Sequence, residues 1–205
     1  MRDRDLVRLY WPVELRPAFD ALFGIDDAFA AVVTSSTQPA LGAIRLAWWR
    51  EALERLDTSP PPPEPRLQAV ADELLPRGIS GKELAALEDG WATLLDEEPD
   101  VDRVSVRGEH LSAIAAKLIG ASDPRLVSAG RMFAIGQARK LVAVPPATDE
   151  LRELHGYRFP RTLRPLTGLA RLAARDANQA PGIEPQATPG RAAALLSHRL
   201  WGRVA

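Results

Sequence analysis

Residues 13–33 read VELRPAFDALFGIDDAFAAVV, and their apolar side chains recur every three or four positions, which predicts a long amphipathic helix. Pro12 and Pro17 lie near the start of this segment, where a helix tolerates proline. The same periodicity returns along the rest of the chain, and no convincing alternating strand pattern appears. We therefore expect an all-α fold. The apolar stripe comprises Leu15, Ala18, Phe19, Leu22, Phe23, Ile25, Phe29, Val32 and Val33.

Outward from this segment, the pattern predicts about eight helices in a single domain over residues 1–205. The spacing of Ser80 and Glu83 is that of a capping box, so a helix is expected to begin there. Residues 59–65, SPPPPEP, cannot be helical and are expected to form a stiff internal loop. A loop rich in Pro, Gly and Gln is expected between the last two helices. The further helices are expected at residues 39–56, 67–75, 80–95, 104–119, 124–142, 162–175 and 189–203, with a weak turn of helix at 149–154.

Composition excludes several classes of function. The 205 residues carry 26 basic and 27 acidic side chains, and this balance argues against nucleic acid as a partner. There is no cysteine, which removes disulfides, thiolate metal sites and cysteine nucleophiles, and the three histidines lie far apart in the sequence. No apolar run approaches the roughly 20 residues of a transmembrane helix, and the start is too charged for a signal peptide. We expect a cytoplasmic protein, with peripheral contact to the inner membrane left open.

Residues 41–53, LGAIRLAWWREAL, are similar to a fingerprint of the squalene/phytoene synthase family, the head-to-head prenyl-diphosphate synthases. Three other stretches resemble that family in the same order, at residues 16–25, 130–137 and 161–166 together with 191–203. The resemblance covers most of the chain and is strongest over residues 16–53. It implies an isoprenoid-synthase-like helical bundle with a shortened C-terminal half.

The family ionises prenyl diphosphates with Mg²⁺, which two DxxxD pairs on facing helices hold through their carboxylates. In ungapped register, the ends of the first pair fall on Ala30 and Thr34, and the second pair falls on residues 141–145, beginning at Leu141. None of these end positions is acidic. The resemblance therefore implies a degenerate member with no catalytic residues, no metal ligands and no cofactor. The alternative is a Mg²⁺-dependent prenyltransferase that uses other carboxylates.

The acidic pair Asp26 and Asp27 lies one helical turn before the expected first motif. Two interpretations are open: the pair belongs to a solvated helix face, which we expect, or it lines a site. A single carboxylate pair would hold diphosphate-bound Mg²⁺ poorly without a second one opposite it.

Six residues are candidate contacts for a ligand or a protein partner. Adjacent positions on a helix diverge by about 100°, so one of the two neighbouring tryptophans is expected in the core and the other at a cavity or partner. The residues near 140 stand in place of the second aspartate motif. They either form a positively charged entrance that binds an anion, or they stabilise the C-terminus of a helix through its dipole. The candidates are Arg45, Trp48, Trp49, Arg50, Gln137 and Lys140.

These features predict a protein that acts through an unidentified protein partner or through an isoprenoid or lipid ligand. A branch of the family that has lost its aspartates contains the mitochondrial assembly factors of respiratory complex I, so the resemblance implies an assembly-factor-like role. The C-terminal segment 191–203 is a basic amphipathic helix. It either packs its apolar side inward or contacts a membrane surface.

Overall fold

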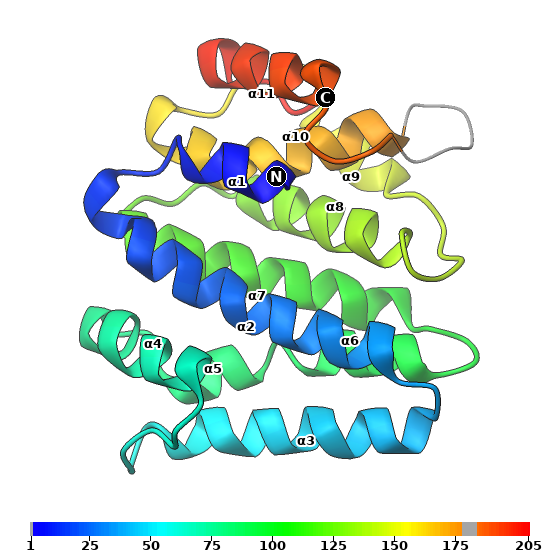
Figure 1. Ribbon diagram of the computed structural model, residues 1–205. Helices are drawn as coiled ribbons and strands as arrows, with labels where there is room; N and C mark the ends of the chain where they lie inside the picture. The colour runs from blue at the N-terminus through cyan, green and yellow to red at the C-terminus, as the bar shows by residue number, and fades with distance from the viewer. Residues whose placement is uncertain (1, 178–183) are drawn as a thin grey trace.

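The helical periodicity is realised as an all-α fold in the computed structural model, which describes residues 2–177 and 184–205 (Figure 1). No strand forms within these residues, and Arg158 and Arg203 make one isolated antiparallel bridge. Part of the loop expected between the last two helices, residues 178–183, lies outside the described residues. The α-helices are α1 (Asp3–Arg8), α2 (Arg16–Ser35), α3 (Pro39–Arg55), α4 (Pro65–Glu73), α5 (Gly81–Ala85), α6 (Asp89–Ala92), α7 (Val101–Ile119), α8 (Leu126–Ala138), α9 (Thr148–Leu154), α10 (Arg164–Ala177) and α11 (Pro189–Trp201).

The expected number of about eight helices is too low, because the described residues contain eleven α-helices. The short helix α1 was not expected, and the single helix expected over 80–95 is divided into α5, α6 and a 3-10 turn at Thr93–Leu95. This division lets α5 pack against α3 while α6 packs against α7. The contact with α7 is so close that a Cβ on Gly90 would lie 2.5 Å from the Cβ of Arg107.

Side-chain caps define the starts of two helices, and the first of them was expected from the sequence. The Ser80 hydroxyl accepts a hydrogen bond from the backbone N–H of Glu83, and the Glu83 carboxylate accepts one from the N–H of Ser80, as the capping box predicts. Asp100 caps α7 by accepting from the N–H groups of Asp102 and Arg103. Residues 59–64 of the proline-rich stretch form an internal loop, as expected, but Pro65 is already the first residue of α4, where a helix tolerates proline.

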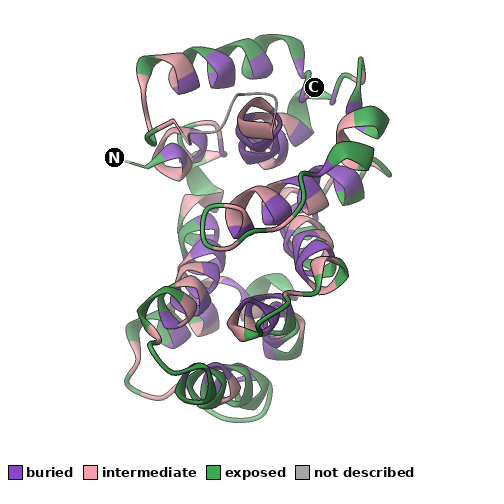
Figure 2. Cartoon of the chain, turned by 90° about the vertical axis from the view of Figure 1, so that its right-hand side faces the viewer, coloured by how far each residue is buried: buried purple, intermediate pink, exposed green. Residues whose placement is uncertain are grey.

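The helices are stacked, with α3 at one end of the molecule, α11 at the opposite end, and α2, α7 and α8 between them (Figure 1). Buried residues lie on the facing sides of the helices (Figure 2). The central contact joins α7 to α8 and depends on two glycines. A Cβ on Gly108 would lie only 2.1 Å from the carbonyl oxygen of Gly130, so the two backbones touch there.

A buried ion network joins α11 to the N-terminus. The Arg191 guanidinium of α11 contacts the carboxylates of Asp3 and Asp176, at 2.8 and 2.5 Å. Burial alone would lower the pKa of Arg191, but its hydrogen bonds to Asp176 and Asp3 outweigh burial and raise it. The first and last helices are therefore held together by charge as well as by apolar contact.

His198 is buried beneath α11. Its Nδ1 lies 2.8 Å from the carbonyl oxygen of Arg203, so Nδ1 carries the proton, and Nε2 lies 2.9 Å from the Thr167 hydroxyl. Burial lowers the pKa of His198, and the nearby charges of Arg171 and Arg164 lower it further. The folded chain therefore holds this imidazole neutral.

We predict that the free energy of unfolding falls as the pH is lowered from about 7.5 through about 6.5, the usual pKa of histidine. In this range the unfolded chain binds a proton at His198 that the folded chain excludes, so acidification favours unfolding. Urea titrations at several pH values measure the effect. The variant His198→Gln should lose this part of the pH dependence, whereas substitution of the exposed His155 by Gln should keep it. An unchanged slope in His198→Gln would contradict the assignment.

Candidate functional site

A pocket of about 280 Å³ opens where α1, α2 and α8 meet. Its walls combine an apolar side with a cluster of cationic and amide side chains. Three cationic and two anionic side chains reach it, so it carries a small positive excess. The lining residues are Arg2, Asp3, Arg4, Phe23, Asp27, Ala30, Thr34, Trp91, Phe133, Gln137, Lys140, Leu141, Leu169 and Gln186.

The polar edge of the pocket is built around Asp27 on α2. Arg2 Nη1 lies 2.8 Å from Asp27 Oδ2, and Arg4 Nη1 lies 2.7 Å from Asp27 Oδ1. Arg4 also donates to the carbonyl oxygen of Phe23 at 3.0 Å, which ties α1 to α2. On the other side, Lys140 Nζ lies 3.8 Å from Asp176 and is a weakly paired cation.

Asp26, the neighbour of Asp27, is fully buried, so the expectation that both aspartates lie on a solvated helix face is wrong for Asp26. Its Oδ1 accepts hydrogen bonds from Arg107 Nη1 at 2.6 Å and from Trp91 Nε1 at 2.8 Å, and its Oδ2 accepts one from Gln137 Nε2 at 3.3 Å. Burial lowers the pKa of Arg107, although Asp26 opposes this. The buried carboxylate of Asp26 is thus stabilised by hydrogen-bond donors on three other helices, α6, α7 and α8.

Gln137 connects this buried network to the pocket. Its amide nitrogen donates to Asp26, while its amide oxygen accepts from Arg107 Nη2 at 2.9 Å. Both ends of the amide are therefore engaged, and its position on α8 is fixed. Of the residues selected from the sequence, Gln137 and Lys140 line the pocket together.

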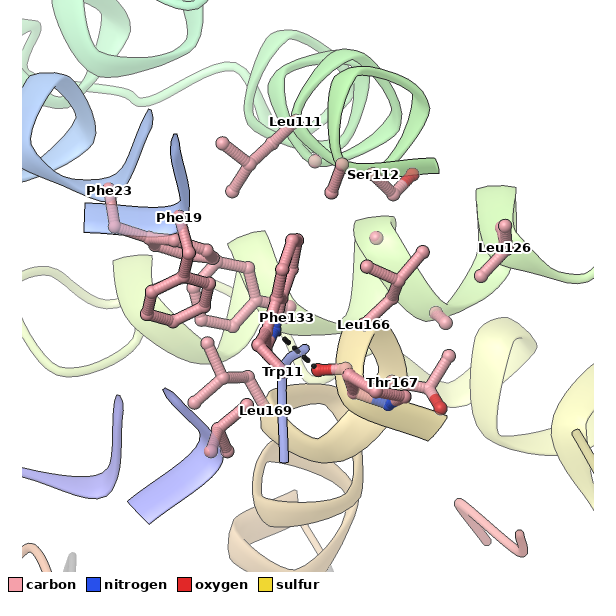
Figure 3. Close-up of a pocket in the computed structure, with 16 residues that line it drawn as sticks. Trp11, Phe19, Phe23, Leu111, Ser112, Leu126, Phe133, Leu166, Thr167 and Leu169 are labelled. Carbon is pink, nitrogen blue, oxygen red and sulfur yellow. Dashed lines mark hydrogen bonds between the residues drawn. The ribbon is translucent and has the colours of Figure 1, made fainter. Parts of the chain in front are cut away.

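Aromatic rings fill the space behind the pocket. A second cavity of only about 30 Å³ lies there, and Phe23, Phe133 and Leu169 line both spaces (Figure 3). The rings of Phe19 and Phe23 are 4.5 Å apart, and Trp11 donates its indole N–H to the carbonyl oxygen of Pro165 at 3.2 Å. A cavity of this volume holds little more than one or two water molecules, so a prenyl chain does not fit in it without side-chain movement.

Three of the four positions that the resemblance aligns with the ends of the aspartate motifs line the same pocket, and Pro145 does not. Ala30, Thr34 and Leu141 all line it, although α2 and the end of α8 are more than 100 residues apart in the chain. The Thr34 hydroxyl donates to the carbonyl oxygen of Ala30 at 2.9 Å and is thus satisfied within its own helix. Two segments from distant parts of the sequence therefore line one pocket.

This donor set does not fit Mg²⁺. Asp26 is enclosed by Arg107 and Trp91, and Asp27 is bound by two arginines, so neither carboxylate is free to coordinate a cation. Across residues 2–177 and 184–205, no group of three or more His, Asp or Glu side chains could hold a metal ion.

The other four candidates lie on α3, away from the pocket. Trp49 is 8% exposed and packs edge-on against Phe29, whereas Trp48 is 46% exposed, so the two tryptophans divide as their spacing predicts. Arg45 is exposed and donates to the Ser35 hydroxyl at 3.2 Å. Arg50 lies 3.5 Å from Glu88. The structure thus separates these residues from Gln137 and Lys140.

Sequence reasoning missed Arg2, Arg4, Arg107 and Trp91 as parts of the site. Arg2 and Arg4 belong to α1, a helix too short to give a clear periodic signal. Arg107 interrupts the buried face of α7 between Val104 and Leu111, and this buried-face arginine is the signal that could have revealed it.

No protein-family model, curated protein or solved structure matches this chain. In the described part of the chain, no helix is long and apolar enough to cross a membrane.

We predict that Asp26→Asn lowers the free energy of unfolding by about 3–5 kcal/mol, because it leaves the Arg107 charge buried and uncompensated. The neighbouring substitution Asp27→Asn is the matched control. It removes the same charge from a partly exposed position and should cost about 1 kcal/mol or less. Urea unfolding monitored by circular dichroism gives both values. Equal losses in the two variants would refute the central role of the buried pair.

Proposed function

We propose that this chain is a non-catalytic, squalene/phytoene synthase-like protein that binds the anionic head of an isoprenoid or lipid in the pocket between α1, α2 and α8 without converting it. The observation that carries this proposal is the composition of the pocket. Residues in register with the family's two metal-binding motifs line this pocket, but they are Ala30, Thr34 and Leu141, with Gln137 and Lys140 beside them.

The polar edge of the pocket supports an anionic head. Lys140 is exposed and has only a distant carboxylate partner, so its ammonium is available to a phosphate. Arg2 is also exposed and shares the carboxylate of Asp27 with Arg4. Charge-assisted hydrogen bonds from such groups stabilise a phosphate without a metal ion.

The apolar side supports the first part of a hydrocarbon chain. Phe23, Phe133, Leu141 and Leu169 form a continuous wall next to the cationic edge. The volume of about 280 Å³ is at the small end for ligand pockets, which suits a head and a short length of chain. A longer chain would extend over the surface, because the interior behind Phe23 is filled.

We predict that farnesyl diphosphate binds with or without Mg²⁺ and is recovered unchanged. Lys140→Ala should weaken binding about tenfold, because it removes one charge-assisted contact, while Arg45→Ala on α3 should leave the affinity unchanged. Isothermal titration calorimetry measures the affinity, and product analysis after incubation with Mg²⁺ measures turnover. Release of diphosphate with formation of a C30 hydrocarbon would support the alternative, a Mg²⁺-dependent head-to-head prenyltransferase. Absence of binding would overturn the proposal.

A second candidate function, an assembly-factor-like contact with a protein partner, is favoured by the outer face of α3. Leu41, Ile44 and Trp48 lie at positions i, i+3 and i+7 of that helix, and all three are exposed. Such spacing places them along one side of the helix. A contiguous apolar stripe of this kind is typical of a helix that contacts another protein.

For this second function we predict that Leu41→Glu/Ile44→Glu loses a partner that the parent chain retains in affinity purification from its native cells. Because both side chains are exposed, the variant should unfold at the same urea concentration as the parent. Leu196→Glu/Leu200→Glu on α11 is the matched control and should retain the partner. Retention by the α3 variant would rule out this face as the contact.

A further inference from the structure

Helix α11 is apolar on two opposite sides. Its inner side carries Ala194 and Leu195, which are buried against the rest of the protein. Its outer side carries Leu196 and Leu200, which are 53% and 58% exposed. Trp201, which is 60% exposed, ends the helix and lies about 100° around its axis from Leu200. Figure 2 shows that α11 is the outermost helix and that, among residues 2–177 and 184–205, no other segment covers its outer side. The helix therefore presents large exposed apolar side chains at one end of the molecule.

Arginines gather beside these apolar side chains. Arg161, Arg164 and Arg199 line a hollow of about 340 Å³ together with Tyr10 and Leu200. The Arg199 guanidinium stacks over the Tyr10 ring at 4.7 Å. Cations from the end of α11, the start of α10 and the turn just before α10 thus meet at one place, beside the ring of Tyr10.

Two more arginines extend this cluster. The backbones of Arg158 and Arg203 form the isolated bridge, so these two residues lie next to each other at the end of α11. Within residues 2–177 and 184–205, none of the five arginines at 158, 161, 164, 199 and 203 makes an ion pair with a carboxylate. The whole chain has a net charge of -1, so this concentration of positive charge is local.

Arg164 also organises the hollow. Its Nε donates to the carbonyl oxygen of Phe159 at 3.1 Å, and its Nη1 donates to the carbonyl oxygens of Arg199 and Leu200 at 2.9 and 3.0 Å. These bonds tie the start of α10 to the end of α11. Burial lowers the pKa of Arg164, and the charge of Arg161 lowers it further, as expected for cations held together without a counter-ion. A bound anion would relieve this repulsion.

We propose that the surface formed by Leu196, Leu200, Trp201, Arg161, Arg164 and Arg199, the α11 surface, docks on a lipid bilayer that contains anionic lipids. The outer side of α11 lies in the interface, and the hollow between the three arginines receives the phosphate of a lipid headgroup. This function is separate from ligand binding in the pocket between α1, α2 and α8.

The shape and chemistry of the surface favour a bilayer over a protein partner. Exposed leucine and tryptophan on an outermost helix, bordered by arginine, form the pattern of helices that lie in a membrane interface. The planar guanidinium groups match phosphate oxygens geometrically. A deformable bilayer can cover an exposed apolar ridge and fill the adjacent hollow at the same time, whereas a protein would need a groove of complementary shape.

The test is co-sedimentation of the full chain with vesicles. We expect binding to vesicles of phosphatidylcholine mixed with phosphatidylglycerol, little binding to vesicles of phosphatidylcholine alone, and weaker binding as salt is raised. Arg161→Gln/Arg199→Gln should lower the partition coefficient about 25-fold, since each basic residue near an anionic surface contributes about fivefold. Leu196→Gln/Leu200→Gln should lower it at least about tenfold. Arg164 is left intact because it holds the end of α11.

Matched controls on the opposite end of the molecule are Arg45→Gln/Arg55→Gln and Leu41→Gln/Ile44→Gln, which remove two arginines and two exposed aliphatic side chains from α3 and should leave binding unchanged. Urea unfolding verifies that every variant is folded. Failure to bind the anionic vesicles, or equal losses in the α3 controls, would overturn the proposal. Undiminished binding of Leu196→Gln/Leu200→Gln would also overturn it, because the apolar side would then lie outside the interface. Release from the vesicles by millimolar inorganic phosphate would assign the hollow to a soluble anion instead.

Discussion

The buried pair of Asp26 and Arg107 is the constraint on which the arrangement of the central helices depends. An uncompensated charge in the core is costly, so both groups require partners at fixed positions. Trp91 supplies its indole N–H to Asp26, and its ring lies 4.2 Å from the Arg107 guanidinium, while Gln137 bonds to both charges. Helices α2, α6, α7 and α8 are therefore joined at a single cluster. Next to it, Gly108 lets the backbones of α7 and α8 touch, so electrostatic and steric constraints fix the same crossing.

This cluster also determines the chemistry of the pocket. Because Asp26 points inward to Arg107, its neighbour Asp27 lies on the next part of the helix circumference and meets Arg2 and Arg4 at the pocket edge. The two adjacent carboxylates are thus each neutralised by arginine. A site for Mg²⁺ requires carboxylates that are free of such partners. A site for the anionic head of a lipid instead requires cationic side chains next to a wall of apolar side chains. The pocket has the second set of properties.

The sequence predicts those parts of the structure that depend on residues close together in the chain. Apolar periodicity predicts α2 and α3, the spacing of Ser80 and Glu83 predicts a helix start, and the 100° step between neighbours predicts that Trp48 and Trp49 face different environments. Asp26 shows the limit of this reasoning: its burial depends on an arginine 81 positions later, and nothing within α2 identifies that partner. The break of the expected helix over 80–95 has the same origin, since it follows from contacts of α5 with α3 and of α6 with α7.

The network of ion pairs around Arg191 connects the pocket with α11. Asp176 faces Lys140 at the pocket edge and also contacts the buried Arg191 of α11. Arg191 in turn contacts Asp3. In the sequence, Asp3 stands between Arg2 and Arg4, the two arginines that bind Asp27. An anion that takes Lys140 therefore competes with Asp176, and the released carboxylate is still held by Arg191. Loss of the contact between Lys140 and Asp176 would therefore leave the buried charge of Arg191 paired, so the proposed ligand binding in the pocket is compatible with the proposed docking of α11.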